Sequence, residues 1–280
     1  MRETSNPVFR SLPKNEGGYA QFGTGVAGAA QVGYQTDQYA PYTTPQAGVS
    51  RPLTIDDVVT QTGITLGVLS VVAVLSYFLV SANLALAMPL TLVGGLGGLV
   101  LVLIATFGRK QDSPAIVLSY AALEGLFLGA VSFILANLYV SGASAGALIG
   151  QAILGTVGVF VGMLIVYKTG AIRVTPKFTR MMVAGMVGVL VLMLGNMVIS
   201  MFGSHDGGPL RNGGTLAIIF SLVCIALAAF SFLIDFDAAD QMIRAGAPEK
   251  AAWGIALGLT VTLVWLYLEM LRLLSYFQQR

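Results

Sequence analysis

Six ionisable side chains lie within, or at the end of, long apolar segments of the sequence. One glutamate has at least eight uncharged residues on either side, three aspartates gather in one short stretch, and a second glutamate precedes an arginine by three residues. An ionised group in hydrocarbon costs about 2.5–3.5 kcal/mol on insertion scales, so such residues are usually functional. The candidates for a functional site are Glu124, Asp235, Asp237, Asp240, Glu269 and Arg272.

Two of the carboxylates also have a purely structural interpretation. Asp240 and Arg244 are four residues apart, a spacing that allows an ion pair on one helix face. Glu269 and Arg272 are three residues apart and can neutralise each other in the same way. We favour the structural interpretation for Asp240 and the functional one for Glu269, because charges inside a membrane are usually functional.

Carboxylates that converge from different helices would form a pH-sensitive site. Two carboxylates held close together cannot both ionise cheaply, so one keeps its proton until the pH rises or a cation arrives. Ligation by oxygen alone suits calcium or a proton rather than zinc or copper. We therefore expect no resident metal or other cofactor, apart from a calcium ion at these carboxylates.

Other chemistries find little support in the sequence. A single cysteine, Cys224, and a single histidine, His205, cannot form a disulfide framework or a Cys/His metal cluster. Residues 142–146 spell the Gly-x-Ser-x-Gly pattern of a nucleophilic serine, but that pattern works only between a strand and a helix. Here it lies in a short loop between apolar segments, so we expect no catalytic residues and no enzyme.

The composition is that of an integral membrane protein. Of the 280 residues, 56% are hydrophobic and only 10% are charged. Soluble domains carry roughly 25% charged residues, because a folded surface needs charge to stay dissolved. The formal net charge of +2 is too small to indicate a nucleic-acid partner. The lipid bilayer is therefore the expected partner.

The apolar segments predict an all-α bundle of seven membrane-spanning helices, since about 20 residues of helix cross the hydrocarbon core. Residues 1–50, rich in Gly, Gln, Pro and Thr, are expected to form a disordered cytoplasmic tail. The membrane domain is expected at 51–280, with Thr54 as the cap of the first helix. The predicted spans are 64–82, 87–107, 114–136, 147–167, 181–202, 214–236 and 253–277.

Paired glycines inside the spans predict close contacts between helices. The pairs Gly125/Gly129, Gly158/Gly162 and Gly254/Gly258 each recur at a spacing of one helical turn, and a further group lies at 94–98. Such small faces let helices approach closely in lipid. We expect packing within one bundle rather than dimerisation.

The lysines and arginines predict the orientation, because they concentrate in cytoplasmic loops. With the N-terminus inside, the opposite side receives only Arg211 and Arg280. An odd number of spans then places the C-terminus outside. The cytoplasmic side receives, besides the basic residues of the tail, Arg51, Arg109, Lys110, Lys168, Arg173, Lys177, Arg180, Arg244 and Lys250.

Three segments of the membrane region resemble one known family. They are Tyr120 to Gly129 (YAALEGLFLG), Ile234 to Asp237 (IDFD) and Leu266 to Glu269 (LYLE). In their order and spacing they are similar to the Bax inhibitor-1/YccA family of transmembrane Bax inhibitor motif proteins, and the chain is identified as a bacterial member over about residues 55–277. The resemblance implies a seven-helix bundle, with the last helix central, that acts as a pH-sensitive calcium leak channel in the cell membrane.

The resemblance also implies particular site residues. A pair of aspartates on the last two membrane helices senses pH and gates the pore in that family. By motif they fall on Asp237, with Asp235 as the alternative, and on Glu269, which is Glu where the family has Asp. An arginine latches the closed pore, and Arg272 is our candidate because the first six predicted spans contain no arginine.

The depth of the two carboxylates depends on where the last helix enters the membrane. If the span starts at Trp253, Glu269 lies about 24 Å up the helix, far from Asp237. We favour an arrangement in which the last two helices extend into the cytoplasm, because this brings Glu269 toward mid-depth.

An alternative function is regulatory. Bacterial relatives in the family are associated with restraining a membrane protease, so the partner would then be another membrane protein. The tyrosine-containing tail would be the recruiting segment, although a disordered tail is more often a solvated appendage.

Overall fold

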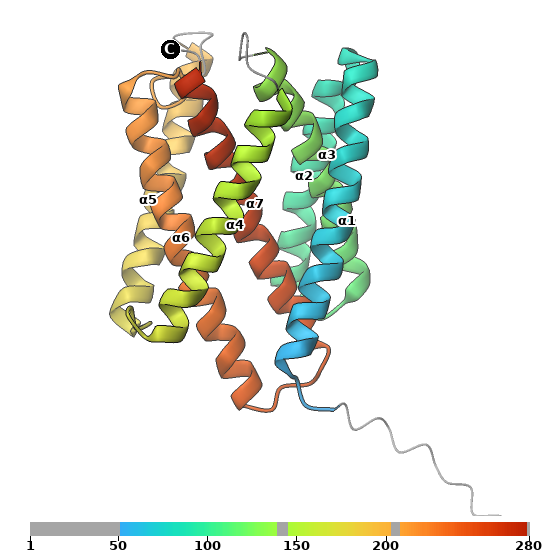
Figure 1. The fold of residues 1–280 in the computed structure, drawn as a ribbon, viewed down its shortest axis with the longest axis vertical. Helices are drawn as coiled ribbons and strands as arrows, with labels where there is room; N and C mark the ends of the chain where they lie inside the picture. The colour runs from blue at the N-terminus through green and yellow to red at the C-terminus, as the bar shows by residue number, and fades with distance from the viewer. Residues whose placement is uncertain (1–50, 139–144, 203–207, 279–280) are drawn as a thin grey trace, which may run out of the picture. The chain divides into compact units, whose positions relative to one another are not determined.

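The computed structural model describes residues 51–138, 145–202 and 208–278. In this part of the chain, seven helices are long and apolar enough to cross a membrane. They run alternately up and down in Figure 1. The helices are α1 (Ile55–Ala82), α2 (Ala87–Phe107), α3 (Pro114–Phe133), α4 (Ala145–Thr169), α5 (Pro176–Phe202), α6 (Thr215–Arg244) and α7 (Ala251–Gln278).

The predicted all-α seven-helix architecture is therefore confirmed. The helices α1, α2, α4, α5 and α7 cover their predicted spans, and a short 3-10 turn (Leu84–Leu86) joins the first two. The α-helix α3 ends at Phe133 and continues as a π-helical segment (Ile134–Leu138), and α6 begins one residue after its predicted start. The main difference is length, because α6 continues to Arg244 and α7 begins at Ala251. Both helices thus extend beyond the apolar segments, as the favoured arrangement of the last two helices requires.

The first helix begins where its capping residue predicts. The Thr54 hydroxyl and the Asp57 carboxylate form a reciprocal capping box with each other's backbone N–H groups. Just before it, Arg51 pairs with Asp57 and with Glu249 of the α6–α7 loop. Hydrogen bonds to these two carboxylates raise the pKa of Arg51 above its usual range. This network ties the start of α1 to the turn between the last two helices.

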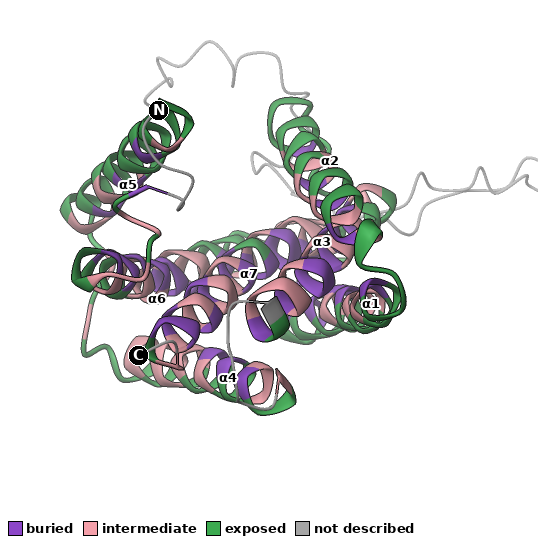
Figure 2. Ribbon diagram, turned by 90° about the horizontal axis from the view of Figure 1, so that it is seen from above, coloured by how far each residue is buried: buried purple, intermediate pink, exposed green. Residues whose placement is uncertain are grey.

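The last helix, α7, lies at the centre of the bundle. It packs against α1, α3, α4 and α6, and Figure 2 shows buried residues along its length. Within the most apolar part of α7, 56% of the residues are buried, against 17% for α5. The expectation of a central last helix is confirmed, whereas α5 lies at the periphery and packs mainly on α6.

Glycines on α2 and α3 allow α3 to pack closely against its neighbours α1 and α2. A Cβ atom on Gly129 would lie within 2.6 Å of the Ser76 side chain of α1, and one on Gly94 of α2 would lie 2.5 Å from the Phe127 nitrogen. These positions therefore exclude any larger side chain. In contrast, a Cβ on Gly158 or Gly162 of α4 would meet no atom within 4 Å. The predicted close packing therefore holds at Gly129 and Gly94, and it fails for the α4 pair and for Gly258 of α7, where a Cβ would also meet no atom within 4 Å.

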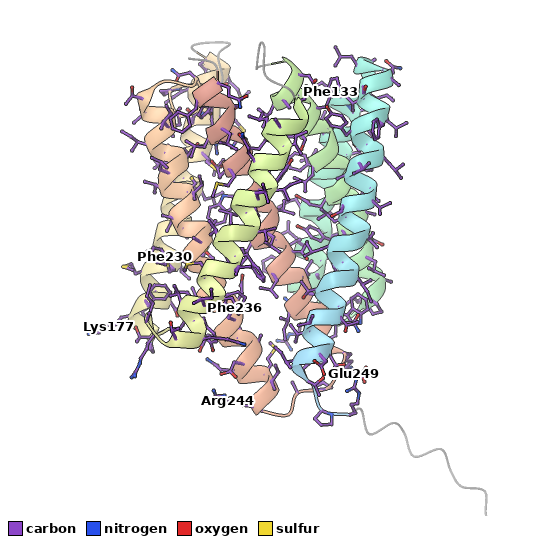
Figure 3. The ribbon with its side chains drawn as sticks, viewed as in Figure 1. Phe133, Lys177, Phe230, Phe236, Arg244 and Glu249 are labelled. Atoms are coloured by element: carbon purple, nitrogen blue, oxygen red, sulfur yellow. The ribbon has the colours of Figure 1, made fainter. Side chains whose placement is uncertain are left out.

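The charged residues of the loops gather at one end of the bundle. Figure 3 shows Lys177, Arg244 and Glu249 at the same end, with Phe133 at the other. We call the first the basic end and the other, where α7 finishes, the C-terminal end. The predicted tail (1–50), the Gly-x-Ser-x-Gly serine Ser144 and His205 lie outside the described residues.

Candidate functional site: a buried charge cluster on the central helix

The most deeply buried charge is the carboxylate of Glu269 on α7. Its side chain is only 2% exposed. One turn further along the same helix, Arg272 Nη1 lies 3.0 Å from Glu269 Oε1, as the three-residue spacing predicts. The ion pair is therefore present, but it is only half of the site.

A second arginine reaches Glu269 from the loop between α5 and α6. Arg211 Nη2 lies 3.0 Å from Oε1, and Nη1 donates to Oε2 over 3.2 Å. Two parallel N–H donors on the two oxygens of one carboxylate form a bidentate pair, the strongest geometry for such a contact. The Arg211 side chain is 14% exposed, so the pair is largely shielded from solvent.

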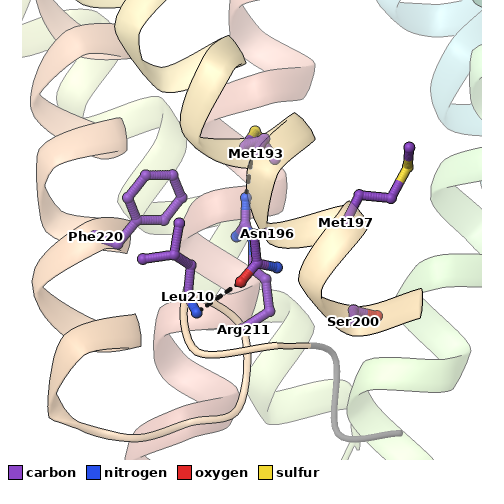
Figure 4. Close-up of a pocket in the computed structure, with 7 residues that line it drawn as sticks. All are labelled: Met193, Asn196, Met197, Ser200, Leu210, Arg211 and Phe220. Carbon is purple, nitrogen blue, oxygen red and sulfur yellow. Dashed lines mark hydrogen bonds between the residues drawn. The ribbon is translucent and has the colours of Figure 1, made fainter. Parts of the chain in front are cut away.

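Several contacts hold Arg211 in this position. Its guanidinium lies over the Phe220 ring of α6 at 5.3 Å from the centroid, a favourable cation–π arrangement. The Tyr276 hydroxyl donates to its carbonyl oxygen over 3.3 Å. The neighbouring Leu210 N–H donates to the Asn196 side chain of α5 over 2.9 Å, as Figure 4 shows. The loop is thus fastened to α5, α6 and α7.

The loop needs a glycine to make this approach. Gly208 has φ +74°, and a Cβ atom there would lie 2.7 Å from the Asn196 side-chain oxygen. Side chains rarely adopt that backbone region. A cavity of about 220 Å³ lies beside the loop, between α5 and α6, and Asn196 and Arg211 both line it.

The Arg211–Glu269–Arg272 cluster holds two cations and one carboxylate. It therefore carries a formal charge of +1 at neutral pH. Charges interact strongly in an apolar environment, so the cluster is a local barrier to a cation. The carboxylate in turn is fully compensated by its two arginines.

Asp235 occupies a separate position between α6 and α7. Its side chain accepts a hydrogen bond from the hydroxyl of Thr262 on α7, which donates over 2.7 Å. Thr262 precedes Glu269 by two helical turns, so Asp235 lies about 10 Å closer to the basic end than Glu269. No lysine or arginine pairs with Asp235 in the described part of the chain.

The other two aspartates face the basic end. Asp237 accepts a hydrogen bond from Gln241 over 2.6 Å. Asp240 pairs with Arg244 at 2.8 Å, as the four-residue spacing predicts, and Tyr167 of α4 donates to it over 3.4 Å. These carboxylates therefore have partners near the loop, away from Glu269.

Asp237 and Glu269 are not brought together in this structure. They have different partners and lie about 13 Å apart in depth, at about 1.5 Å of rise per residue. Asp235, the alternative of the pair, is nearer to Glu269 and lies on the α6–α7 interface. The assignment of a pH-sensing pair to these residues stays a prediction.

Glu124 belongs to a different interface, between α2 and α3. Its side chain is 9% exposed, and a Cβ on Gly98 of α2 would lie 2.5 Å from its Oε2 atom. The glycine thus makes room for a carboxylate against the backbone of α2. The structure gives Glu124 no contact with the cluster on α7.

The residue that sequence reasoning missed is Arg211. It lies in a loop between two predicted spans, whereas the latch candidate Arg272 lies inside a predicted span. A signal was nevertheless present, because Arg211 is one of only two basic residues on a side that is otherwise free of them. A lone arginine that departs from the positive-inside pattern is a candidate for a buried ion pair.

The described residues contain no group of three or more His, Cys, Asp or Glu side chains that could hold a metal ion. The fold and the buried charges instead define a multi-pass membrane protein with a central ion-paired helix. The family model described as Bax inhibitor 1 like matches residues 6–279, and the chain belongs to this family. No curated protein was found to match the chain.

The family match is broader than the motifs suggested. It begins at residue 6, so it includes most of the N-terminal segment that the resemblance over 55–277 leaves out.

Proposed function

We propose that the protein is a pH-dependent cation leak channel of the cell membrane, closed in the conformation described here. The observation that carries the proposal is the double pairing of Glu269 with Arg211 and Arg272 inside the bundle. Ion-paired residues inside a membrane mark ion pathways more often than they serve structure alone. Arg211 takes the role of the latch that we expected of Arg272.

The charges are arranged as a closed cation path would require. Asp235 and Asp237, whose side-chain partners are a hydroxyl and an amide, give this part of α6 a local negative charge, which attracts cations. Their oxygen atoms are ligands that suit calcium, which is the transported substrate in this proposal and needs no cofactor. Further along α7, the net positive cluster repels the same ion.

Opening requires that Arg211 leave Glu269. The hydrogen bonds of Leu210 and Arg211 in this loop are made near the ends of α5 and α7, so these contacts can break without unpacking the bundle core. Release would remove one positive charge and leave the Glu269–Arg272 pair, which has no net charge. A cation arriving from the basic end would then meet a neutral pair in place of a positively charged barrier.

The pH dependence is assigned to the carboxylates of the last two helices. Asp235 has a neutral hydroxyl as its partner, so its charge is not compensated by a cation. Protonation would therefore change the potential along the α6–α7 interface. Asp237 and Glu269 are the other two carboxylates to which the proposal assigns pH sensing.

The orientation is also a proposal, with the N-terminus in the cytoplasm and the C-terminus outside. Its support is the concentration of lysines and arginines at the basic end. In this orientation the arginine latch faces the outside.

Calcium flux into liposomes containing the purified protein tests the proposal, across pH about 5 to about 8, where a coupled carboxylate pair can titrate. We expect pH-dependent flux in the wild type and a higher flux at every pH in Arg211→Gln. Asp235→Asn, Asp237→Asn and Glu269→Gln should reduce the pH dependence. Arg244→Gln is the matched control, because it removes an arginine from an ion pair at the exposed end.

An absence of flux at every pH, in both the wild type and Arg211→Gln, would overturn the leak channel. A regulator that binds another membrane protein would then be the leading function. Capture of a membrane protease, with and without residues 1–50, would test that regulator.

A further inference from the structure

A laterally open groove lies on the side of the bundle away from the charge cluster. It encloses about 540 Å³ and is lined by α1, α3, α4 and α7. Figure 2 shows α4 and α1 on the same side of α7, with the central helix behind them. Val74 and Phe78 of α1 and Ile153 of α4 contribute to its walls, and Leu263, Val264 and Tyr267 of α7 contribute to its floor.

The groove is continuous with the lipid-facing surface of the protein. The wall residues Val74, Phe78 and Ile153 are 54%, 63% and 48% exposed, although they lie within membrane-spanning helices. Side chains exposed at that position contact hydrocarbon. An empty groove would leave its lining without dispersion contacts. Lipid is the apolar molecule that surrounds this opening on the membrane side.

The dimensions of the groove fit one leaflet. On α1 it extends from Leu66 to Phe78, which is about 18 Å at 1.5 Å per residue. Half of a hydrocarbon core is about 15 Å. A groove that crossed both leaflets would need about twice this length. The occupant is thus a single extended chain that enters from one side of the bilayer.

Polar groups gather toward the C-terminal end of the groove. The Ser132 and Tyr267 hydroxyls are 2.7 Å apart, and the Asn137 amide donates to the Tyr77 hydroxyl over 3.1 Å. Tyrosine hydroxyls lie preferentially at the level of lipid headgroups. The other end is lined by apolar side chains such as Leu66 and Val157. This polarity matches a lipid whose headgroup faces the C-terminal end.

We propose that this groove is a binding site for one acyl chain of a membrane lipid. The chain lies between α1 and α4, and its methyl end points toward the bilayer centre. Its contacts include Leu263 and Tyr267, so the site places lipid directly on the central helix. The inference is independent of the ion-transport proposal, because it uses none of the charged residues.

Photolabelling tests the site in vesicles of phosphatidylcholine that contain a small share of phosphatidylcholine with a diazirine on one acyl chain. After illumination, labelled peptides are mapped by mass spectrometry. We expect adducts on Leu263 and Tyr267 of the floor, besides those on outward-facing residues. Ordinary boundary lipid labels outward-facing residues alone, so floor adducts report occupancy.

A filled groove provides the decisive variant. Ser70 and Gly146 both line the groove, and a Cβ on Gly146 would meet no atom within 4 Å, so Ser70→Leu/Gly146→Leu fills the space without a clash at residue 146. Floor labelling should fall about tenfold, because the added side chains take the volume and the contacts of the chain. The matched control is Gly67→Leu/Gly158→Leu, at two open glycines of the same helices outside the groove.

Four results would overturn the proposal. Floor labelling could be absent in the wild type, or equal in the filled variant and the control. It could also appear only when residues 1–50 are deleted, which would identify that segment as the occupant. Finally, floor residues that crosslink to a second copy of the chain rather than to lipid would make the groove an interface between copies. Circular dichroism of each variant confirms that the bundle is folded.

Discussion

The carboxylates at the two ends of the α6–α7 interface differ in their burial and in their partners. Toward the C-terminal end, Glu269 is sealed from solvent and paired with two arginines. Toward the basic end, Asp235 has a hydroxyl as its partner, Asp237 an amide and Asp240 an exposed arginine. A charge that is removed from water needs close compensation, whereas a charge near the surface can rely on water and weaker partners.

This difference has a consequence for function. In the proposed channel, the positively charged cluster toward the C-terminal end blocks cations, and the carboxylates toward the basic end attract them. Substitutions at successive positions from the C-terminal end to the basic end should therefore reduce the free energy of unfolding by progressively smaller amounts.

The largest effect is expected for Glu269→Ala. It leaves two arginines facing each other without a counter-charge, and breaking a buried pair in this way costs about 3–5 kcal/mol. Unfolding in detergent micelles, followed by circular dichroism, measures the loss. A variant as stable as the wild type would mean that the cluster is open to water.

Arg211→Gln should have a smaller effect, a loss of about 1–3 kcal/mol, because Arg272 still neutralises Glu269. The same unfolding measurement applies. The double variant Arg211→Gln/Glu269→Gln tests the pairing, since residues in one ion-paired network are not additive. Additive losses would contradict a direct interaction between the two side chains.

Asp235→Asn should lower stability by about 1 kcal/mol or less, because an amide oxygen can still accept the hydrogen bond from Thr262. The loss is measured against Thr262→Val, which removes the donor and leaves the carboxylate without its partner. If the two variants were equally stable, the Asp235–Thr262 contact would contribute nothing.

The smallest effect is expected for Asp240→Asn, within about 0.5 kcal/mol, because the Arg244 side chain is 78% exposed and its ion pair is weak. What remains of the contribution should disappear at high salt. A loss of stability as large as that of Arg211→Gln would contradict the proposed difference between the two ends.

Much of the fold follows from local patterns in the sequence. The apolar runs predicted the seven helices, and Thr54 predicted the start of the first. The pairs Asp240–Arg244 and Glu269–Arg272 were also predictable, because residues three or four apart share a helix face. The glycine pairs were not distinguishable by spacing, although Gly129 contacts α1 and Gly158 faces open space.

The sequence by itself determined which segments become helices and which charges they carry into the membrane, since hydropathy and helical periodicity act over a few residues. Only the tertiary structure decided that Arg211 reaches Glu269 across 58 residues of chain, and that Asp235 meets Thr262 rather than Glu269. The physical reason is that the depth and rotation of each helix are set by its packing against several neighbours at once. No single segment of sequence contains that information.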